Sequence, residues 1–305
     1  MTNTDTCSQK QTEETFNFKW KKRETYESPA VQLEWKRWLF EKYFDGDESI
    51  LRESILGKQR KRILDAGCGS GGSGLLLFGD YLRQHDYTGV DISDAVDVAR
   101  VRFAERNLPA NFMKYDLMQL PEELGNFDVI FSEGVLHHTD SVGSAIAQLT
   151  KRLAVGGIFM FYVYLKKAPV REFTDDLVRE AISGMTNDEA WQALEPLTKL
   201  GKILGDLNIE IDIQESIPFL GIERGKINLQ RLFYYKICKA YYRPDYTIDE
   251  MNHINFDWFR PRNCYRHSPE EVSKFCAAAG LGVSRMHVEE SGITVIATKK
   301  APTKT

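Results

Sequence analysis

One stretch, ILDAGCGSGGSG over residues 63–74, limits the folds open to this chain more than any other. An apolar run ends in Asp65, glycines follow at positions 67, 69, 71, 72 and 74, and an apolar segment over 75–78 comes directly after them. Glycine lets the backbone turn tightly and approach a ligand closely, and the start of the next helix presents free amides. The stretch therefore predicts a strand, a ligand-binding loop and a helix, with Asp65 placed to hold the loop.

The glycine pattern alone fits more than one class of protein. Gly67, Gly69 and Gly72 satisfy the G-x-G-x-x-G pattern of dinucleotide-binding domains, and Asp91 follows about twenty residues later. A nicotinamide-dependent oxidoreductase is therefore one interpretation, and features elsewhere in the chain must distinguish it from other classes of nucleotide-binding protein.

Residues 61–164 alternate between short apolar runs and helical stretches, which is typical of βαβ units and a parallel sheet. We expect strands over 62–66, 87–92, 111–115, 127–132 and 157–164, and helices over 94–107 and 141–153. Two further strands are expected over 283–288 and 293–298. The turn between these last two is too short for a crossover helix, so they should pair antiparallel.

Four segments in order, LDAGCGSG, GVDIS, FDVIFSEGVLHH and LAVGGIFMF, resemble class I S-adenosylmethionine-dependent methyltransferases. The likeness is greatest to the broad group that includes the ubiquinone/menaquinone-biosynthesis type, and it covers about 62–164 and 268–299. It implies an α/β fold with a Rossmann-like seven-stranded sheet that ends in an antiparallel hairpin, and S-adenosyl-L-methionine as cofactor. An oxidoreductase would not explain Asp116, the SEGVLHH segment or the terminal hairpin.

The resemblance also implies roles for residues at the strand ends. Asp65, Gly67 and Gly69 would border the methionine part of the cofactor. Asp91 would accept hydrogen bonds from both ribose hydroxyls, because a carboxylate offers several acceptor positions. The remaining implied contacts are Ile92 and Leu117 against the adenine ring, Asp116 with the adenine amino group, and Ser132 and Glu133 beside the sulfonium.

The core is accompanied by segments of different character. We expect a disordered polar tail over 1–15, an N-terminal helical lid over 16–60, the cofactor-binding core over 61–164, a mostly helical cap insertion over 165–265 and the C-terminal part of the core over 266–300. Within the cap, Thr186 and Glu189 form a capping box that opens a helix. The cap leaves from the end of the fifth strand, so we expect it over the carboxyl ends of the strands.

Two places could supply acceptor chemistry. His137 and His138 follow the fourth strand, at the edge where open α/β sheets bind ligands, and either could be a general base. The stretch NHINFDWFRPRNCYRH over 252–267 holds His253 and Tyr265 among aromatic residues. Aromatic walls with a few polar groups suit a small organic acceptor, although a packed hinge between cap and core is an equal alternative. The attacked atom stays open.

Composition narrows the partners. The formal net charge is −4 and the sequence pI about 6.0, which gives no electrostatic signature of nucleic-acid binding. No apolar run has the roughly 18–20 residues of a membrane span, and the polar segment over 1–15 does not contain the apolar stretch of a signal peptide. We therefore expect a cytoplasmic enzyme with a small-molecule acceptor. A macromolecular acceptor and a non-catalytic cofactor-binding protein remain alternatives, and the oligomeric state is not predicted.

No metal is expected. The five cysteines are scattered and form no C-x-x-C pair, which favours reduced thiols over disulfides or a zinc site. His253, Asp257, Cys264 and His267 are close in sequence, but their spacing matches no convincing ligand set.

Overall fold

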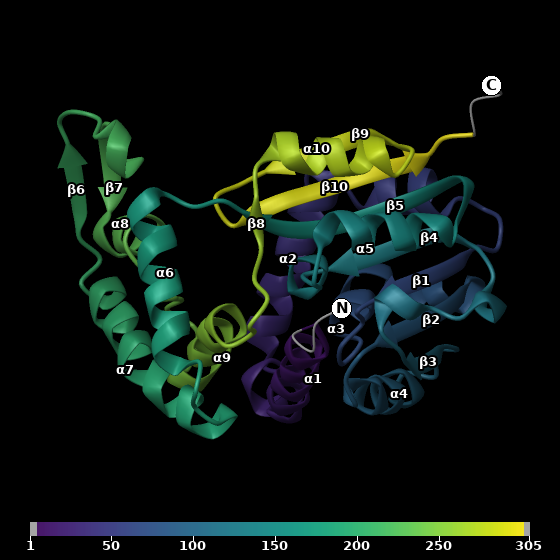
Figure 1. Ribbon diagram of the computed structural model, residues 1–305, viewed down its shortest axis with the longest axis horizontal. Helices are drawn as coiled ribbons and strands as arrows, with labels where there is room; N and C mark the ends of the chain where they lie inside the picture. The colour runs from purple at the N-terminus through teal and green to yellow at the C-terminus, as the bar shows by residue number, and fades with distance from the viewer. Residues whose placement is uncertain (1–4, 302–305) are drawn as a thin grey trace. The chain divides into compact units, whose positions relative to one another are not determined.

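The structure is a computed structural model and describes residues 5–301 (Figure 1). These residues divide into two compact units. Unit 1 comprises residues 5–21, 32–165 and 265–301, and unit 2 comprises residues 22–31 and 166–264.

Unit 1 is built on a seven-stranded sheet in the order β3-β2-β1-β4-β5-β10-β9. Neighbouring strands from β3 to β5 pair parallel, whereas β10 pairs antiparallel with both β5 and β9. A two-residue strand, β8, pairs with the end of β5. The strands are β1 (Arg62–Ala66), β2 (Asp86–Asp91), β3 (Asn111–Lys114), β4 (Phe127–Glu133), β5 (Leu153–Leu165), β8 (Arg266–His267), β9 (Leu281–Val288) and β10 (Gly292–Lys299).

Both faces of this sheet are buried, because successive side chains of a strand point to opposite faces. Ile63 belongs to one apolar cluster and Leu64 to the other, and Val129 and Ile130 repeat the alternation on β4. The helices of unit 1 are α1 (Asp5–Lys21), α2 (Pro29–Phe44, whose first residues lie in unit 2), the π-helix η2 (Ile50–Leu56), α3 (Gly72–Phe78), α4 (Ala95–Glu105), α5 (Val142–Lys151) and α10 (Pro269–Ala278). Residues of α2, η2, α3 and α4 complete the first cluster, and those of α5 and α10 the second.

Short 3-10 helices fill several connections. In unit 1 they are η3 (Gly79–Gln84), η4 (Leu117–Gln119), η5 (Glu122–Leu124) and η6 (Leu136–His138). In unit 2 they are η1 (Arg23–Thr25) and η7 (Pro218–Leu220).

The expected fold is confirmed. All seven strands form within a few residues of their predicted limits, and the terminal pair is the predicted antiparallel hairpin. β10 enters between β5 and β9, so the hairpin extends the sheet from its β5 side. The carboxyl ends of the parallel strands share one edge, which carries the residues that follow each strand.

The predicted disordered tail over 1–15 is wrong from Asp5 onward, where α1 begins; residues 1–4 lie outside the described part of the chain. Polar contacts hold this helix against the core. Glu13 forms an ion pair with Lys114 at 2.6 Å, and the Asn17 side chain accepts from the Asp94 backbone N–H at 2.7 Å. The sequence did not reveal this order, because the partners of α1 that the structure shows, such as Lys114 and Asp94, lie far away along the chain.

Unit 2 contains the expected insertion, but it is not wholly helical. Its helices are α6 (Pro169–Ile182), α7 (Asn187–Asp206), α8 (Leu229–Lys236) and α9 (Ile248–Phe259), and it adds a two-stranded antiparallel sheet of β6 (Glu210–Ile213) and β7 (Gly225–Asn228). The predicted capping box of Thr186 and Glu189 opens α7. A second box, Thr247 with Glu250, opens α9 and was not recognised in the sequence.

The N-terminal segment expected as one lid over 16–60 is helical but divided between the units. Residues 22–31 belong to unit 2, whereas the segments on either side of them belong to unit 1. A helical pattern reports local conformation and not the body against which a segment packs, so this division could not be seen in the sequence.

Candidate functional site

The glycine loop after β1 is held close to the end of β2. The backbone N–H groups of Gly67 and Cys68 both donate to the Val90 carbonyl, at 2.7 and 3.0 Å. Gly67 has a φ of +84°, and a Cβ atom there would lie 2.3 Å from Val135. Only glycine satisfies both the backbone conformation and this close approach. The loop is therefore held in a close-packed conformation against the end of β2.

Asp91, at the carboxyl end of β2, is buried and hydrogen-bonded to the same loop. One carboxylate oxygen accepts from the Gly69 N–H at 2.8 Å, and the other accepts from the N–H and the hydroxyl of Ser93 at 2.9 and 2.6 Å. Burial raises the pKa of Asp91, while the hydrogen bonds from Ser93 and Gly69 oppose that shift. A carboxylate has about four acceptor positions, so three internal donors leave about one for a ligand.

Asp65 lies under the first turn of α3. Its carboxylate accepts from the Tyr87 hydroxyl, and a Cβ atom on Gly74 would lie 2.7 Å from the Asp65 carboxylate and 2.0 Å from the Tyr87 oxygen. Burial raises the pKa of Asp65 to about 7. The structure thus supports the expectation that Asp65 holds the loop, by contact with the turn that follows it.

The next two strand ends carry the residues expected at the adenine ring. Ile92 is half-buried directly after β2, and Leu117 is buried in η4. Asp116 caps η4, because its side chain accepts from the Met118 N–H at 2.8 Å. Asp116 therefore has a structural role as the cap of η4. Its contact with the cofactor stays a prediction.

Ser132 and Glu133 end β4. The Ser132 hydroxyl donates to the Ala66 carbonyl at 2.8 Å, which ties the end of β4 to the end of β1. Glu133 forms a buried ion pair with Lys42 and accepts from the Tyr43 hydroxyl at 2.8 Å. Glu133 therefore has two partners on α2 that hold its carboxylate in place.

Lys42 is a residue that the sequence did not indicate. Its side chain is 1% exposed, and its ammonium lies 3.3 Å from the ring centre of Trp38 and 4.0 Å from that of Tyr162. Burial lowers the pKa of Lys42 to about 8, although Glu133 acts in the opposite direction. A lysine in the segment FEKYF has the appearance of an ordinary solvated charge, and its partner lies 91 residues away. No local signal could have found it.

α1 brings an aromatic residue onto the glycine loop. A Cβ atom on Gly69 would lie 2.8 Å from the ring of Trp20, and the buried Lys19 ammonium lies 4.1 Å from the centre of that ring. The positive charge of Lys19 also acts to lower the pKa of Asp91. In the sequence Trp20 is only part of the expected lid segment, and its contact with the loop is a tertiary feature.

Three of the four candidate catalytic residues lie in unit 1. His137 and His138 are buried in η6, and the His137 ring stacks on Tyr164 with 3.5 Å between centres. The Tyr265 backbone N–H donates to the His137 carbonyl at 2.9 Å, while its side chain is 42% exposed. These residues therefore come together at the ends of β4 and β5.

The fourth, His253, lies in unit 2 on α9. It is buried beside Tyr26 and Trp191, and its Nδ1 lies 2.7 Å from the Thr25 hydroxyl. Trp258, one of the aromatic residues of the 252–267 stretch, is buried in the same helix and donates to Asp175 at 2.8 Å. Trp258 therefore has a packing role inside unit 2.

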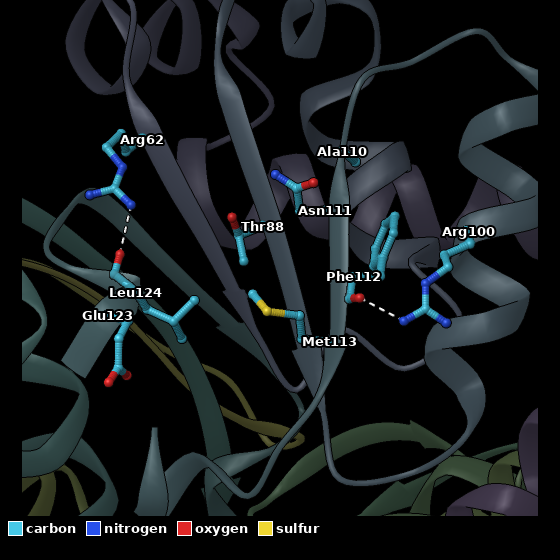
Figure 2. A pocket seen from close by; sticks show the side chains of 9 residues that line it. All are labelled: Arg62, Thr88, Arg100, Ala110, Asn111, Phe112, Met113, Glu123 and Leu124. Carbon is cyan, nitrogen blue, oxygen red and sulfur yellow. Dashed lines mark hydrogen bonds between the residues drawn. The ribbon is translucent and has the colours of Figure 1, made fainter. Parts of the chain in front are cut away.

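Figure 2 shows a hollow of about 480 Å³ on unit 1. Both arginines that line it donate to backbone carbonyls: Arg62 to that of Leu124 and Arg100 to that of Phe112, each at 2.6 Å. None of the site residues named above lines it. The lining residues are Arg62, Thr88, Arg100, Ala110, Asn111, Phe112, Met113, Glu123 and Leu124. We do not assign the cofactor to this hollow, because its lining lacks the buried acceptors at the strand ends.

The part of the chain that the structure describes offers neither a metal site nor a membrane-spanning helix. Within residues 5–301, no group of three or more His, Cys, Asp or Glu side chains is arranged to hold a metal ion. Over the same range, none of the helices combines the length and apolar character that crossing a membrane requires.

The sheet order, the antiparallel β10 and the loop between Asp65 and Asp91 define a class I S-adenosylmethionine-dependent methyltransferase domain. Residues 63–157 match the family described as "Methyltransferase domain". S-adenosylmethionine is the cofactor that this domain indicates. The buried acceptors and close-packed glycine loop described above fit such a nucleoside.

Curated relatives match this domain over part of their length. A ubiquinone biosynthesis O-methyltransferase of Paramagnetospirillum magneticum is 31% identical over 136 residues, which are 43% of this chain and 49% of that protein. A tRNA U34 carboxymethyltransferase of Alcanivorax borkumensis is 36% identical over 101 residues, 32% of this chain and 31% of that protein. The chain thus spans about half or less of the relatives it matches.

The fold can also be compared with that of a solved structure. Magnesium protoporphyrin IX methyltransferase from Synechocystis PCC 6803, with bound S-adenosylhomocysteine, has a TM-score of 0.50 and 15% identity, and the match covers 96% of this chain and 100% of that one. At this identity the likeness concerns the fold alone.

Proposed function

We propose that this chain transfers the methyl group of S-adenosylmethionine to a small organic acceptor. The observation that carries the proposal is the set of cofactor-type residues at the carboxyl edge of unit 1, where Asp91 and the glycine loop form one hydrogen-bonded structure. The cofactor supplies a methyl group on a positively charged sulfur, which is already a good leaving group. The protein then has to align the partners, exclude water and, for some acceptors, remove a proton.

The residues of unit 1 would divide the work of holding the cofactor. Gly67 and Gly69 would allow the backbone to approach its methionine part, and Asp65 would support the loop from below. Asp91 would accept from the ribose, and Ile92, Asp116 and Leu117 would surround the adenine. Glu133 would lie beside the sulfonium, where a carboxylate favours a cation. Lys42 and Tyr43 hold the Glu133 side chain in place, and the Lys42 ammonium balances part of its charge.

We propose further that the insertion in unit 2 selects the acceptor. The insertion begins directly after β5, and the chain re-enters unit 1 just before β8. The strands β5 and β8 pair at their ends. Both connections therefore leave the sheet at the edge that carries Ser132 and Glu133. The candidates for proton transfer are His253, Tyr265, His137 and His138.

Transfer of labelled methyl groups tests the proposal. The protein would be incubated with methyl-labelled S-adenosylmethionine and a cell extract separated into small molecules, RNA and protein. We expect label in the small-molecule fraction, with mass spectrometry locating the methyl group. Label in RNA would instead favour a macromolecular acceptor, which the tRNA-modifying relative makes worth measuring. Cofactor binding without transfer to any fraction would contradict an enzymatic role.

A further inference from the structure

Several positive charges lie against one indole ring inside unit 2. The Lys239 ammonium is 4.6 Å from the centre of the Trp258 ring, and the Arg171 guanidinium carbon is 5.3 Å from it. Lys167 and Arg179 lie at 5.4 and 5.6 Å from the same ring. Lys239 and Arg171 are only 6% and 2% exposed. All five residues belong to unit 2, so this cluster lies within one compact body.

The buried carboxylate of the cluster, Asp175, is already engaged. One of its oxygens accepts from Nε of Arg171 at 2.7 Å and from the indole N–H of Trp258 at 2.8 Å. The other accepts from the backbone N–H of Lys239 at 3.3 Å. Asp175 therefore balances the charge of Arg171, whereas it meets Lys239 through the backbone and not through the ammonium.

The Lys239 ammonium differs from that of Lys42, which is buried to a similar degree but paired with Glu133. Within residues 5–301, no hydrogen bond or ion pair joins the Lys239 ammonium to another residue. Burial lowers the pKa of Lys239 to about 7, although the charge of Asp257 acts in the opposite direction. A buried charge is costly unless a partner compensates it. A ligand that brings a negative charge would supply that partner.

We propose that the cluster around Trp258 is a binding site for a small oxyanion of the carboxylate or phosphate type, with Lys239 pairing with its charge. Arg171 would add a second contact, because a guanidinium has five N–H donors and only Nε and Nη1 are engaged, by Asp175 and the Tyr234 carbonyl. The inference goes beyond the proposed function, because the site lies within unit 2 and requires no methyl transfer. The same chemistry suits an anionic group on the acceptor and a separate small anion.

A neutral amine is the alternative explanation for Lys239, because a buried group can avoid the cost of its charge by releasing a proton. The two explanations differ in their response to an anion. An anion favours the charged amine, so binding above a pH of about 7 requires the uptake of a proton. The affinity should then fall about tenfold or more for each pH unit above that value. The charged and titratable groups that act together with Lys239 are Lys167, Arg171, Asp175, Asp257 and Cys264.

The indole N–H of Trp258 reports on the site directly. The full chain would be prepared with ¹⁵N-labelled tryptophan, which gives five indole signals, and Trp258→Phe would assign the relevant one. Sodium sulfate and sodium acetate would be titrated at constant ionic strength, below and above the Lys239 pKa of about 7. Sulfate keeps its charge over this range. We expect a saturable shift of the Trp258 signal with at least one anion, and a weaker affinity at the higher pH.

Two variants separate a binding role of Lys239 from a structural one. Lys239→Met should abolish the shift, and below the pKa it should melt at a higher temperature than the wild type without anion, because it removes a buried charge. Lys199→Met is the matched control in the same unit, since Lys199 is 57% exposed and paired with Glu195; it should keep the shift. The absence of any shift at Trp258, an equal shift in Lys239→Met or an affinity that does not change with pH overturns the inference.

Transfer of labelled methyl groups to a small-molecule extract identifies the source of the anion. A labelled product with a carboxylate or phosphate group, made more slowly by Lys239→Met at unchanged affinity for S-adenosylhomocysteine, assigns the anion to the acceptor. Equal transfer by Lys239→Met and the wild type, with the Trp258 shift present only in the wild type, assigns it to a separate ligand. A protein that shows the shift but labels no compound refutes the proposed function and leaves the anion site intact.

Discussion

Asp91 offers the sharpest test of the cofactor site, because its carboxylate has two separable roles. Inside the protein it accepts from the Gly69 N–H and from the N–H and hydroxyl of Ser93. Toward the cofactor it is proposed to accept from the ribose. Asp91→Asn keeps the size of the side chain but removes the charge and turns one acceptor oxygen into a donor. This variant therefore disturbs both roles.

The magnitude follows from the number of bonds at stake. A hydrogen bond to a charged group contributes about 1.5–3 kcal/mol. With about one acceptor position left for the ribose, losing that bond should weaken cofactor binding by roughly 10- to 150-fold, since about 1.4 kcal/mol corresponds to tenfold. Losing one internal bond should lower the free energy of unfolding by about 1–3 kcal/mol as well.

Ser93→Ala separates the two effects. It removes the 2.6 Å hydroxyl bond to Asp91 but keeps the charge and the Gly69 bond. We expect a similar loss of stability in urea unfolding, with cofactor affinity equal to or tighter than that of the wild type, because an acceptor position is released. Titration calorimetry with S-adenosylhomocysteine measures all three proteins. Equal losses of affinity in both variants would show that Asp91 acts only by supporting the loop, and the ribose role would be wrong.

Three further expectations follow from the same unit. Calorimetry should show binding of S-adenosylmethionine and S-adenosylhomocysteine but not of NAD, and binding of NAD alone would contradict the class. Lys42→Met should lower the free energy of unfolding in urea by about 3–5 kcal/mol, because it leaves the Glu133 charge buried without its partner. The double variant with Glu133→Gln should recover most of this stability. Equal instability of the single and double variants would argue against the ion pair. The pKa of Asp65 is raised to about 7, so the folded state keeps a proton that the unfolded state loses above about pH 4. The contribution of Asp65 to the free energy of unfolding is therefore fully present below about pH 4 and is lost as the pH rises through 7. In thermal melts, the stability of the wild type relative to Asp65→Asn should fall across this pH range. A difference in stability that stays constant with pH would refute the raised pKa.

The sheet could be predicted from the sequence because its signals are local. A parallel strand buried on both faces needs a continuous apolar run, and residues 129–131 in the middle of β4 show one. A turn too short for a crossover forces an antiparallel pair, and this is how β9 and β10 are joined. The glycines of the loop are equally local, because Gly67 needs a positive φ and has no room for a Cβ atom.

The structure of α1 and of the insertion in unit 2 could not be predicted from such local signals. Residues 5–15 of α1 were expected to be disordered because their sequence is polar, and contacts with distant residues, such as that of Glu13 with Lys114, hold them in place. The β6–β7 hairpin was missed in an insertion whose flanking segments are helical in pattern. In both cases the deciding partner lies outside the window over which a periodic pattern is recognised.

For the site, the sequence by itself determined which residues stand at the ends of the strands, and its resemblance to class I methyltransferases indicated the class of cofactor. Only the tertiary structure decided what those residues touch: that Asp91 already serves three internal donors, that Glu133 is paired with Lys42, and that Thr25 meets His253. The physical reason is that a motif fixes backbone conformation over a few residues, whereas charge pairing and proton position depend on groups brought together from distant parts of the chain.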